Sequence, residues 1–200
     1  MSRCRRSRFE VLLGSSALIA GVMSMCWSVP AWAMDRATAV TDPAGDTRYK
    51  APGYMDIVRV EVSRQGHTIQ VMTILAEPIP AAPALPPPGN DRIAWAWGFD
   101  TDPTTDPKGY PFAEGVPAQA EFILRVDWDG HAFTGKLVDR RPLLTGQEAV
   151  ITPRPFSIVS GTVAMKVDET ALGSPTSFLW DAVTTYFPSP PGSTSLKQAD

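Results

Sequence analysis

Apolar and polar residues alternate along most of this chain from residue 57 onward. Valine and isoleucine alternate with polar residues over 57–63, and the stretch 67–76 (HTIQVMTILA) repeats the pattern. A period of two places the apolar side chains on one face of a β-strand. Further strands of this kind are expected at 92–99, 120–128, 131–138, 156–159, 162–167 and 178–187. No stretch carries a helical stripe of adequate length, so the pattern predicts an all-β protein.

Tight turns separate several of these predicted strands. Gln65-Gly66, Asp129-Gly130 and Ser160-Gly161 each lie between two alternating stretches, where they are typical of β-hairpins. Short strands joined in this way favour two packed sheets over a closed barrel. We therefore expect an antiparallel β-sandwich of about eight to nine strands, of jelly-roll or immunoglobulin-like type.

Proline marks two segments that do not fit the strand pattern. Residues 77–89 contain six prolines, so they predict an extended connection and exclude an interior strand. Residues 188–200 are rich in Pro, Ser and Gly, which predicts a disordered tail. A single sandwich domain is thus expected over 34–187.

The first 33 residues have the features of a signal peptide. Four arginines within residues 3–8 precede an apolar stretch at 11–25, and Ala31-Trp32-Ala33 provides a small-x-small cleavage pattern. An N-terminal membrane anchor is the alternative interpretation, and Arg5-Arg6 leaves general or twin-arginine export open. The chain is expected to be secreted or periplasmic in a bacterium.

Removal of this leader changes the chemistry of the chain. Both cysteines, Cys4 and Cys26, leave with it, and the net charge falls from −3 to −6, because four of 18 basic and one of 21 acidic residues are lost. An acidic surface disfavours nucleic acid as a partner, and no membrane span is expected in the mature chain. An exported domain without disulfides needs another stabilising link, and bound calcium is one.

Six aspartates form two clusters where loops meet predicted strands. The first comprises Asp42, Asp46 and Asp56, and the second comprises Asp100, Asp102 and Asp106. Calcium takes six to eight oxygen ligands, so these loops predict metal ligands at Asp42, Asp46, Asp56, Asp100 and Asp102. The alternative is that each aspartate hydrogen-bonds its own turn backbone and binds no ion.

Aromatic residues divide into core candidates and ligand candidates. Trp95, Trp97 and Phe99 alternate along one strand, so they share a face and are expected in the core. Tyr110 and Phe112 follow the second aspartate cluster in a loop, where aromatic side chains can contact a sugar ring. Asp106, Tyr110 and Phe112 are therefore the predicted ligand-binding residues.

Candidate catalytic groups are few. The chain has only two histidines, His67 and His131, which excludes a three-histidine zinc site, and Gly-x-Ser-x-Gly is absent. Paired aspartates would suit a glycosidase or lyase, but nothing in the sequence separates an acid from a base among them. No catalytic residue is predicted.

Several short motifs together resemble a family of exported β-sandwich modules. They are DPAGD at 42–46, Asp56-Ile57, GFDTD at 98–102, GTVAMKV at 161–167, LGSP at 172–175 and FLW at 178–180. The order is similar to family-nine carbohydrate-binding and DOMON-like modules and to glucodextranase C-terminal-like domains. The resemblance implies calcium at Asp42, Asp46 and Asp56, although no two tryptophans match the sugar-stacking pair of that family.

The sequence thus favours a non-catalytic exported binding module that is stabilised by calcium. Its expected ligand is carbohydrate or another component of the cell envelope. A carboxylate-dependent glycosidase or lyase and a purely structural, partner-docking domain remain as alternatives, and the oligomeric state is left open.

Overall fold

The computed structural model describes residues 7–9, 36–45, 51–85, 92–102, 104, 110 and 119–185. These residues form strands and three short 3-10 helices. The strands are β1 (Ser7–Phe9), β2 (Arg36–Thr41), β3 (Ile57–Gln65), β4 (Thr68–Leu75), β5 (Ile93–Asp100), β6 (Phe122–Trp128), β7 (Phe133–Asp139), β8 (Val150–Pro153), β9 (Phe156–Val159), β10 (Thr162–Asp168) and β11 (Phe178–Thr185). The 3-10 helices are η1 (Gly53–Met55), η2 (Arg141–Thr145) and η3 (Glu169–Leu172).

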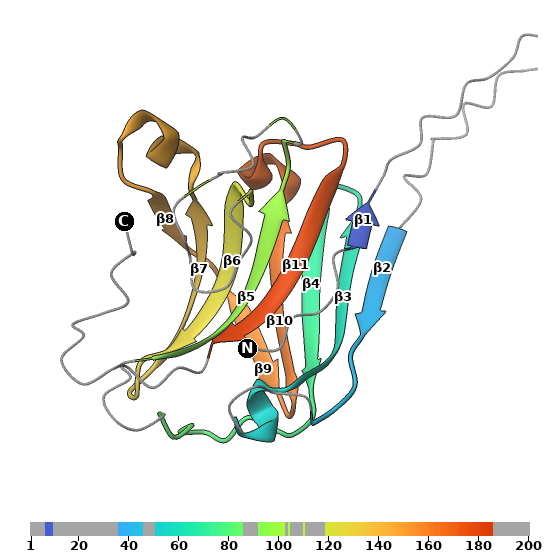
Figure 1. The fold of residues 1–200 in the computed structure, drawn as a ribbon, viewed down its shortest axis with the longest axis vertical. Helices are drawn as coiled ribbons and strands as arrows, with labels where there is room; N and C mark the ends of the chain where they lie inside the picture. Colours follow the sequence, from blue (N-terminus) through green and yellow to red (C-terminus); the bar gives the residue numbers. More distant parts are fainter. Residues whose placement is uncertain are drawn as a thin grey trace, which may run out of the picture.

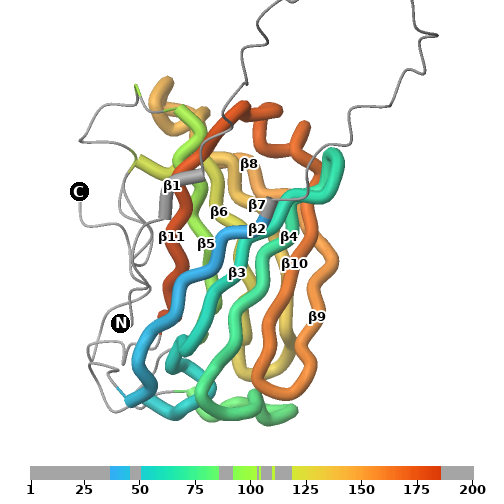
Figure 2. Tube along the Cα trace, turned by 90° about the vertical axis from the view of Figure 1, so that its right-hand side faces the viewer, coloured from blue at the N-terminus to red at the C-terminus, as the bar shows by residue number. Residues whose placement is uncertain are grey.

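The strands build two antiparallel sheets that face each other (Figures 1 and 2). Sheet A has the order β1-β11-β5-β6-β7-β8, and sheet B has the order β2-β3-β4-β10-β9. This arrangement confirms the predicted antiparallel β-sandwich. Three strands, β1, β2 and β8, were not expected from the sequence pattern, and each lies at the edge of its sheet.

Tryptophans of sheet A occupy the centre of the core between the sheets. Trp95, Trp97 and Phe99 are at most 1% exposed, as their alternation along β5 predicts. The Trp97 indole N–H donates to Thr73 Oγ1 on β4 at 2.9 Å, and Trp180 Nε1 donates to Thr38 Oγ1 on β2 at 3.0 Å. These bonds satisfy the buried indole donors and join the two sheets through the core.

The proline-rich connection after β4 packs against one end of the sandwich. Within the described stretch 77–85, Pro83 O accepts a hydrogen bond from Trp128 Nε1 at 2.9 Å, and Ala84 O accepts one from Tyr54 Oη at 3.3 Å. Prolines cannot donate backbone hydrogen bonds, but their carbonyls still accept, so such a segment can cap indole and phenol donors. The described stretch 77–85 forms no strand, as predicted.

Both termini of the chain fall largely outside the described residues. Of the predicted signal peptide only β1 is described, and it pairs with the first residues of β11. The predicted tail at 188–200 is not among the described residues. No helix in the described part of the chain is long and apolar enough to cross a membrane.

The described members of the two aspartate clusters lie at opposite ends of the sandwich. Strand β2 runs toward one end and leads into Asp42, whereas β5 runs toward the other end and finishes at Asp100 (Figure 1). Asp56 precedes β3 beside the end of β2, because Thr41 pairs with Arg59. The fold therefore creates two separate candidate sites.

Candidate functional sites

The turn that follows Asp42 at the end of β2 folds back onto Asp56. Asp42 N donates to Val58 O at 3.0 Å, which continues the β2–β3 pairing by one step. Gly45 adopts a φ of +89°, a left-handed conformation that glycine reaches without the strain that a side chain imposes. Gly45 N then donates to Asp56 Oδ2 at 2.6 Å, so the turn folds onto the Asp56 carboxylate.

The Asp56 carboxylate is buried and only half satisfied. Asp56 is 4% exposed, and Oδ1 has no hydrogen-bond partner among the described residues. Its backbone is fixed on both sides, because Asp56 N donates to Gly53 O at 3.1 Å and Ala76 N donates to Asp56 O at 2.9 Å. A buried carboxylate oxygen without a partner is costly, so the position favours a cation or an ordered water.

The described residues supply only part of a metal-binding set at this end. Asp46, the third predicted ligand, lies outside the described residues. Among the residues that the structure describes, no group of three or more His, Cys, Asp or Glu side chains is placed to hold a metal ion. The oxygen-only chemistry of Asp42 and Asp56 nevertheless suits calcium, which takes carboxylate, carbonyl and water ligands together.

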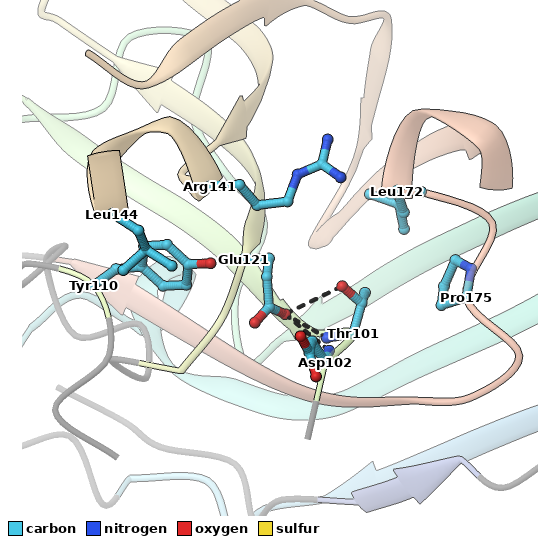
Figure 3. Close-up of a pocket in the computed structure, with 9 residues that line it drawn as sticks. Thr101, Asp102, Tyr110, Glu121, Arg141, Leu144, Leu172 and Pro175 are labelled. Carbon is cyan, nitrogen blue, oxygen red and sulfur yellow. Dashed lines mark hydrogen bonds between the residues drawn. The ribbon is translucent and has the colours of Figure 1, made fainter. Parts of the chain in front are cut away.

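A pocket of about 340 Å³ opens at the other end of the sandwich (Figure 3). It is lined by residues that follow β5, precede β6, belong to η2, or lie at and after the end of η3, together with Tyr110. These residues are Thr101, Asp102, Tyr110, Glu121, Arg141, Leu144, Leu172, Gly173 and Pro175. The volume is at the lower end of the range for small-molecule sites, about 300–1,000 Å³.

Glu121 fixes the floor of this pocket. Its side chain is 2% exposed, and Oε2 accepts hydrogen bonds from Thr101 N at 2.5 Å, Thr101 Oγ1 at 3.1 Å and Asp102 N at 3.3 Å (Figure 3). Three donors on one oxygen tie the residues after β5 to the start of β6. Glu121 therefore has a structural task at the pocket.

Arg140 supports the pocket from inside the protein. It is 2% exposed, donates from Nη1 to Ala120 O at 2.8 Å and lies 4.9 Å from the centre of the Tyr110 ring. Burial lowers the pKa of Arg140 to about 10, although Tyr110 and Glu121 act in the opposite direction. This cation holds the Tyr110 ring in place by a cation–π contact.

Arg141 is held rigidly at the rim of the pocket. Its Nε and Nη2 donate to Asp139 at 2.9 and 2.7 Å, and its guanidinium lies 4.5 Å from the centre of the Phe122 ring. The bidentate bond to Asp139 is the main cause that raises the pKa of Arg141. Because Asp139 occupies Nε and Nη2, Nη1 is the nitrogen left to meet a ligand.

Asp102 contributes an exposed, ionised carboxylate. Its Oδ1 accepts hydrogen bonds from Thr104 Oγ1 at 2.6 Å and Thr104 N at 2.9 Å, and these bonds lower the pKa of Asp102. A general acid for glycoside hydrolysis needs a raised pKa, so the geometry of Asp102 disfavours that role.

Sequence reasoning found part of this pocket. The structure places the predicted residues Asp102 and Tyr110 in its lining, whereas Asp106 and Phe112 lie outside the described residues. Asp100 ends β5 beside the pocket without lining it. Glu121, Arg140 and Arg141 were not predicted, because they flank β6 and β7, and only the pairing of those strands with β5 brings them to this end.

Comparisons with known proteins do not assign these sites to a family. The chain matches no protein-family model, no curated protein and no solved structure.

Proposed function

We propose that this protein is a non-catalytic, exported binding module that is stabilised by calcium and binds a carbohydrate or another envelope component. The observation that supports the proposal is the Asp56 carboxylate, which is buried beside the turn that follows Asp42 and whose Oδ1 has no hydrogen-bond partner among the described residues. Asp42, Asp46 and Asp56 would hold the ion. A bound calcium would offset their mutual repulsion and link β2 to β3.

The pocket at the opposite end supports the binding half of the proposal. Arg141 offers an oriented donor and Asp102 an ionised acceptor, while Leu144, Leu172 and Pro175 supply apolar surface (Figure 3). Sugars present hydroxyl groups that both donate and accept, together with an apolar C–H face. The mixed lining fits a neutral sugar unit better than a fully charged or a fully apolar ligand.

The proposal assigns no catalytic role to the pocket carboxylates. Glu121 accepts three hydrogen bonds from Thr101 and Asp102, and the hydrogen bonds from Thr104 lower the pKa of Asp102, which favours the ionised form of Asp102. Hydrolysis by paired carboxylates needs one protonated partner at working pH.

A glycan array tests the binding half. With calcium present, the purified protein is expected to be retained by at least one class of saccharide, and Arg141→Met is expected to weaken that binding about tenfold or more, as the loss of a charge-assisted hydrogen bond predicts. Arg59→Met is the matched control, because Arg59 pairs with Glu61 on sheet B, away from the pocket. A uniformly negative array, or equal losses in both variants, would remove the carbohydrate proposal.

A further inference from the structure

The exposed large apolar side chains gather on one side of the sandwich. Among the described residues these are Leu144, Val150, Ile151 and Val159, which are 59%, 54%, 60% and 69% exposed. Leu144 lies in η2, Val150 and Ile151 lie in β8, and Val159 lies in β9. Strands β8 and β9 are the last strands of sheets A and B on this side. Exposed apolar side chains along a sheet edge are a feature of association surfaces.

The backbone of β8 presents an unpaired edge. Arg154 N donates to Gly135 O at 2.9 Å, and Thr152 and Val150 continue the same register against Leu137 and Asp139. Alternate residues of an antiparallel strand point their N–H and C=O groups to opposite sides. Ile151 therefore directs its N–H and C=O away from β7, and the structure records no partner for them among the described residues.

We propose that β8 pairs with β8 of a second copy of this chain, antiparallel and centred on Ile151. In this register Ile151 of one copy faces Ile151 of the other, so each N–H can donate to the opposite C=O. Val150 then lies opposite Thr152. The contact is isologous, as expected for a twofold dimer, and it joins two copies of sheet A into one sheet.

The charges that flank β8 are complementary in this register. Glu148 lies three residues before Ile151 and Arg154 lies three residues after it. Antiparallel pairing about Ile151 therefore places Glu148 of each copy opposite Arg154 of the other. Opposite charges at facing positions favour this register, and a parallel arrangement would lose that match.

Proline limits the strength of the pairing. Pro153 has no N–H and Pro155 follows it closely, so few backbone hydrogen bonds form beyond Ile151. A short strand pair buries less surface than a permanent interface, so the dimer is expected to depend on protein concentration.

The dimer goes beyond the proposed function, since it is expected whether or not the pocket binds a saccharide. A dimer would carry two pockets, which would raise avidity for a polymer.

Sedimentation equilibrium over a range of concentrations tests the dimer. The wild-type mass is expected to rise from monomer toward dimer with concentration, and Ile151→Lys is expected to remain monomeric. Val159→Lys is the matched control, because Val159 is also a largely exposed apolar residue but lies in β9, outside the proposed pairing. A wild-type protein that stays monomeric at every concentration, or a Val159→Lys variant that loses the dimer as completely as Ile151→Lys, would overturn the proposal.

Charge reversal and cross-linking test the register. Glu148→Arg is expected to weaken the dimer, and the double variant Glu148→Arg/Arg154→Glu is expected to restore it. In a chain with Cys4 and Cys26 replaced by Ser, Ile151→Cys is expected to form a disulfide between copies under mild oxidation, because only the central residue faces itself. Val150→Cys should cross-link far less. Equal cross-linking of the two variants would exclude pairing about Ile151.

Discussion

Chelating calcium with EDTA is expected to lower the melting temperature of this protein by about 5–10 °C, and added calcium should restore it. An ion present at about 100 times its dissociation constant stabilises the native state by about 2.7 kcal/mol. For a chain of this size, each kcal/mol corresponds to a shift of about 2–4 °C. The source of the effect is the buried Asp56 oxygen, which has no partner among the described residues.

Asp56→Asn separates an ion site from a simple turn cap. Asparagine keeps an oxygen that can accept the hydrogen bond from Gly45 N, but it removes the charge that attracts a cation. The variant is therefore expected to melt at the temperature of the chelated wild type and to gain nothing from calcium. Asp129→Asn is the matched control, because Asp129 caps the turn before β7 through bonds to His131 N and Ala132 N. A calcium response that is equal in both variants would contradict the proposed site.

Glu121→Ala is expected to destabilise the protein by about 3 kcal/mol and to loosen the pocket. The change removes the acceptor of three hydrogen bonds from Thr101 and Asp102, and it removes a carboxylate that favours the buried cation of Arg140. Breaking a buried charge partnership costs about 3–5 kcal/mol, because the remaining charge stays desolvated. Urea unfolding measures the loss of stability.

Hydrogen exchange shows whether that loss is local to the pocket. In Glu121→Ala the amides of Thr101 and Asp102 should exchange faster than in the wild type, because their acceptor is gone. Glu61→Ala is the control, since Glu61 makes a partly exposed pair with Arg59 at 3.2 Å, and such pairs contribute at most about 1 kcal/mol. If the two variants lose equal stability, Glu121 does not organise the pocket.

The alternation of apolar and polar residues predicted the central strands of this fold, because a strand that buries one face carries apolar side chains on that face only. Strand β4 alternates buried and half-buried residues without a break, and the glycines at 66 and 130 mark real turns with positive φ. Strands β2 and β8 were not predicted, because the alternation of apolar and polar residues is weak in both. Strand β2 consists mainly of alanine and threonine around one valine, and strand β8 ends in proline. An edge strand buries little surface, so its sequence needs only weak alternation.

The two candidate sites differ in how far the sequence could predict them. The glycine of the DPAGD motif indicates a turn directly after Asp42, and in the structure Gly45 N donates to the Asp56 carboxylate. The pocket depends on residues that are distant in the chain, since Glu121 and Arg141 reach it only through the pairing of β5, β6 and β7. The second aspartate cluster indicated charged side chains at this end, but nothing in the sequence linked it to Arg140 and Arg141, which follow a different predicted strand.

Isothermal titration of calcium into the metal-free protein tests the central proposal most directly, because it measures the ion at Asp56 without relying on stability. The wild type is expected to bind calcium with a saturable heat that Asp56→Asn abolishes and Asp129→Asn retains. A wild type that gives no heat of binding, or an Asp56→Asn variant that binds as the wild type does, would contradict the calcium-stabilised module proposed for this chain.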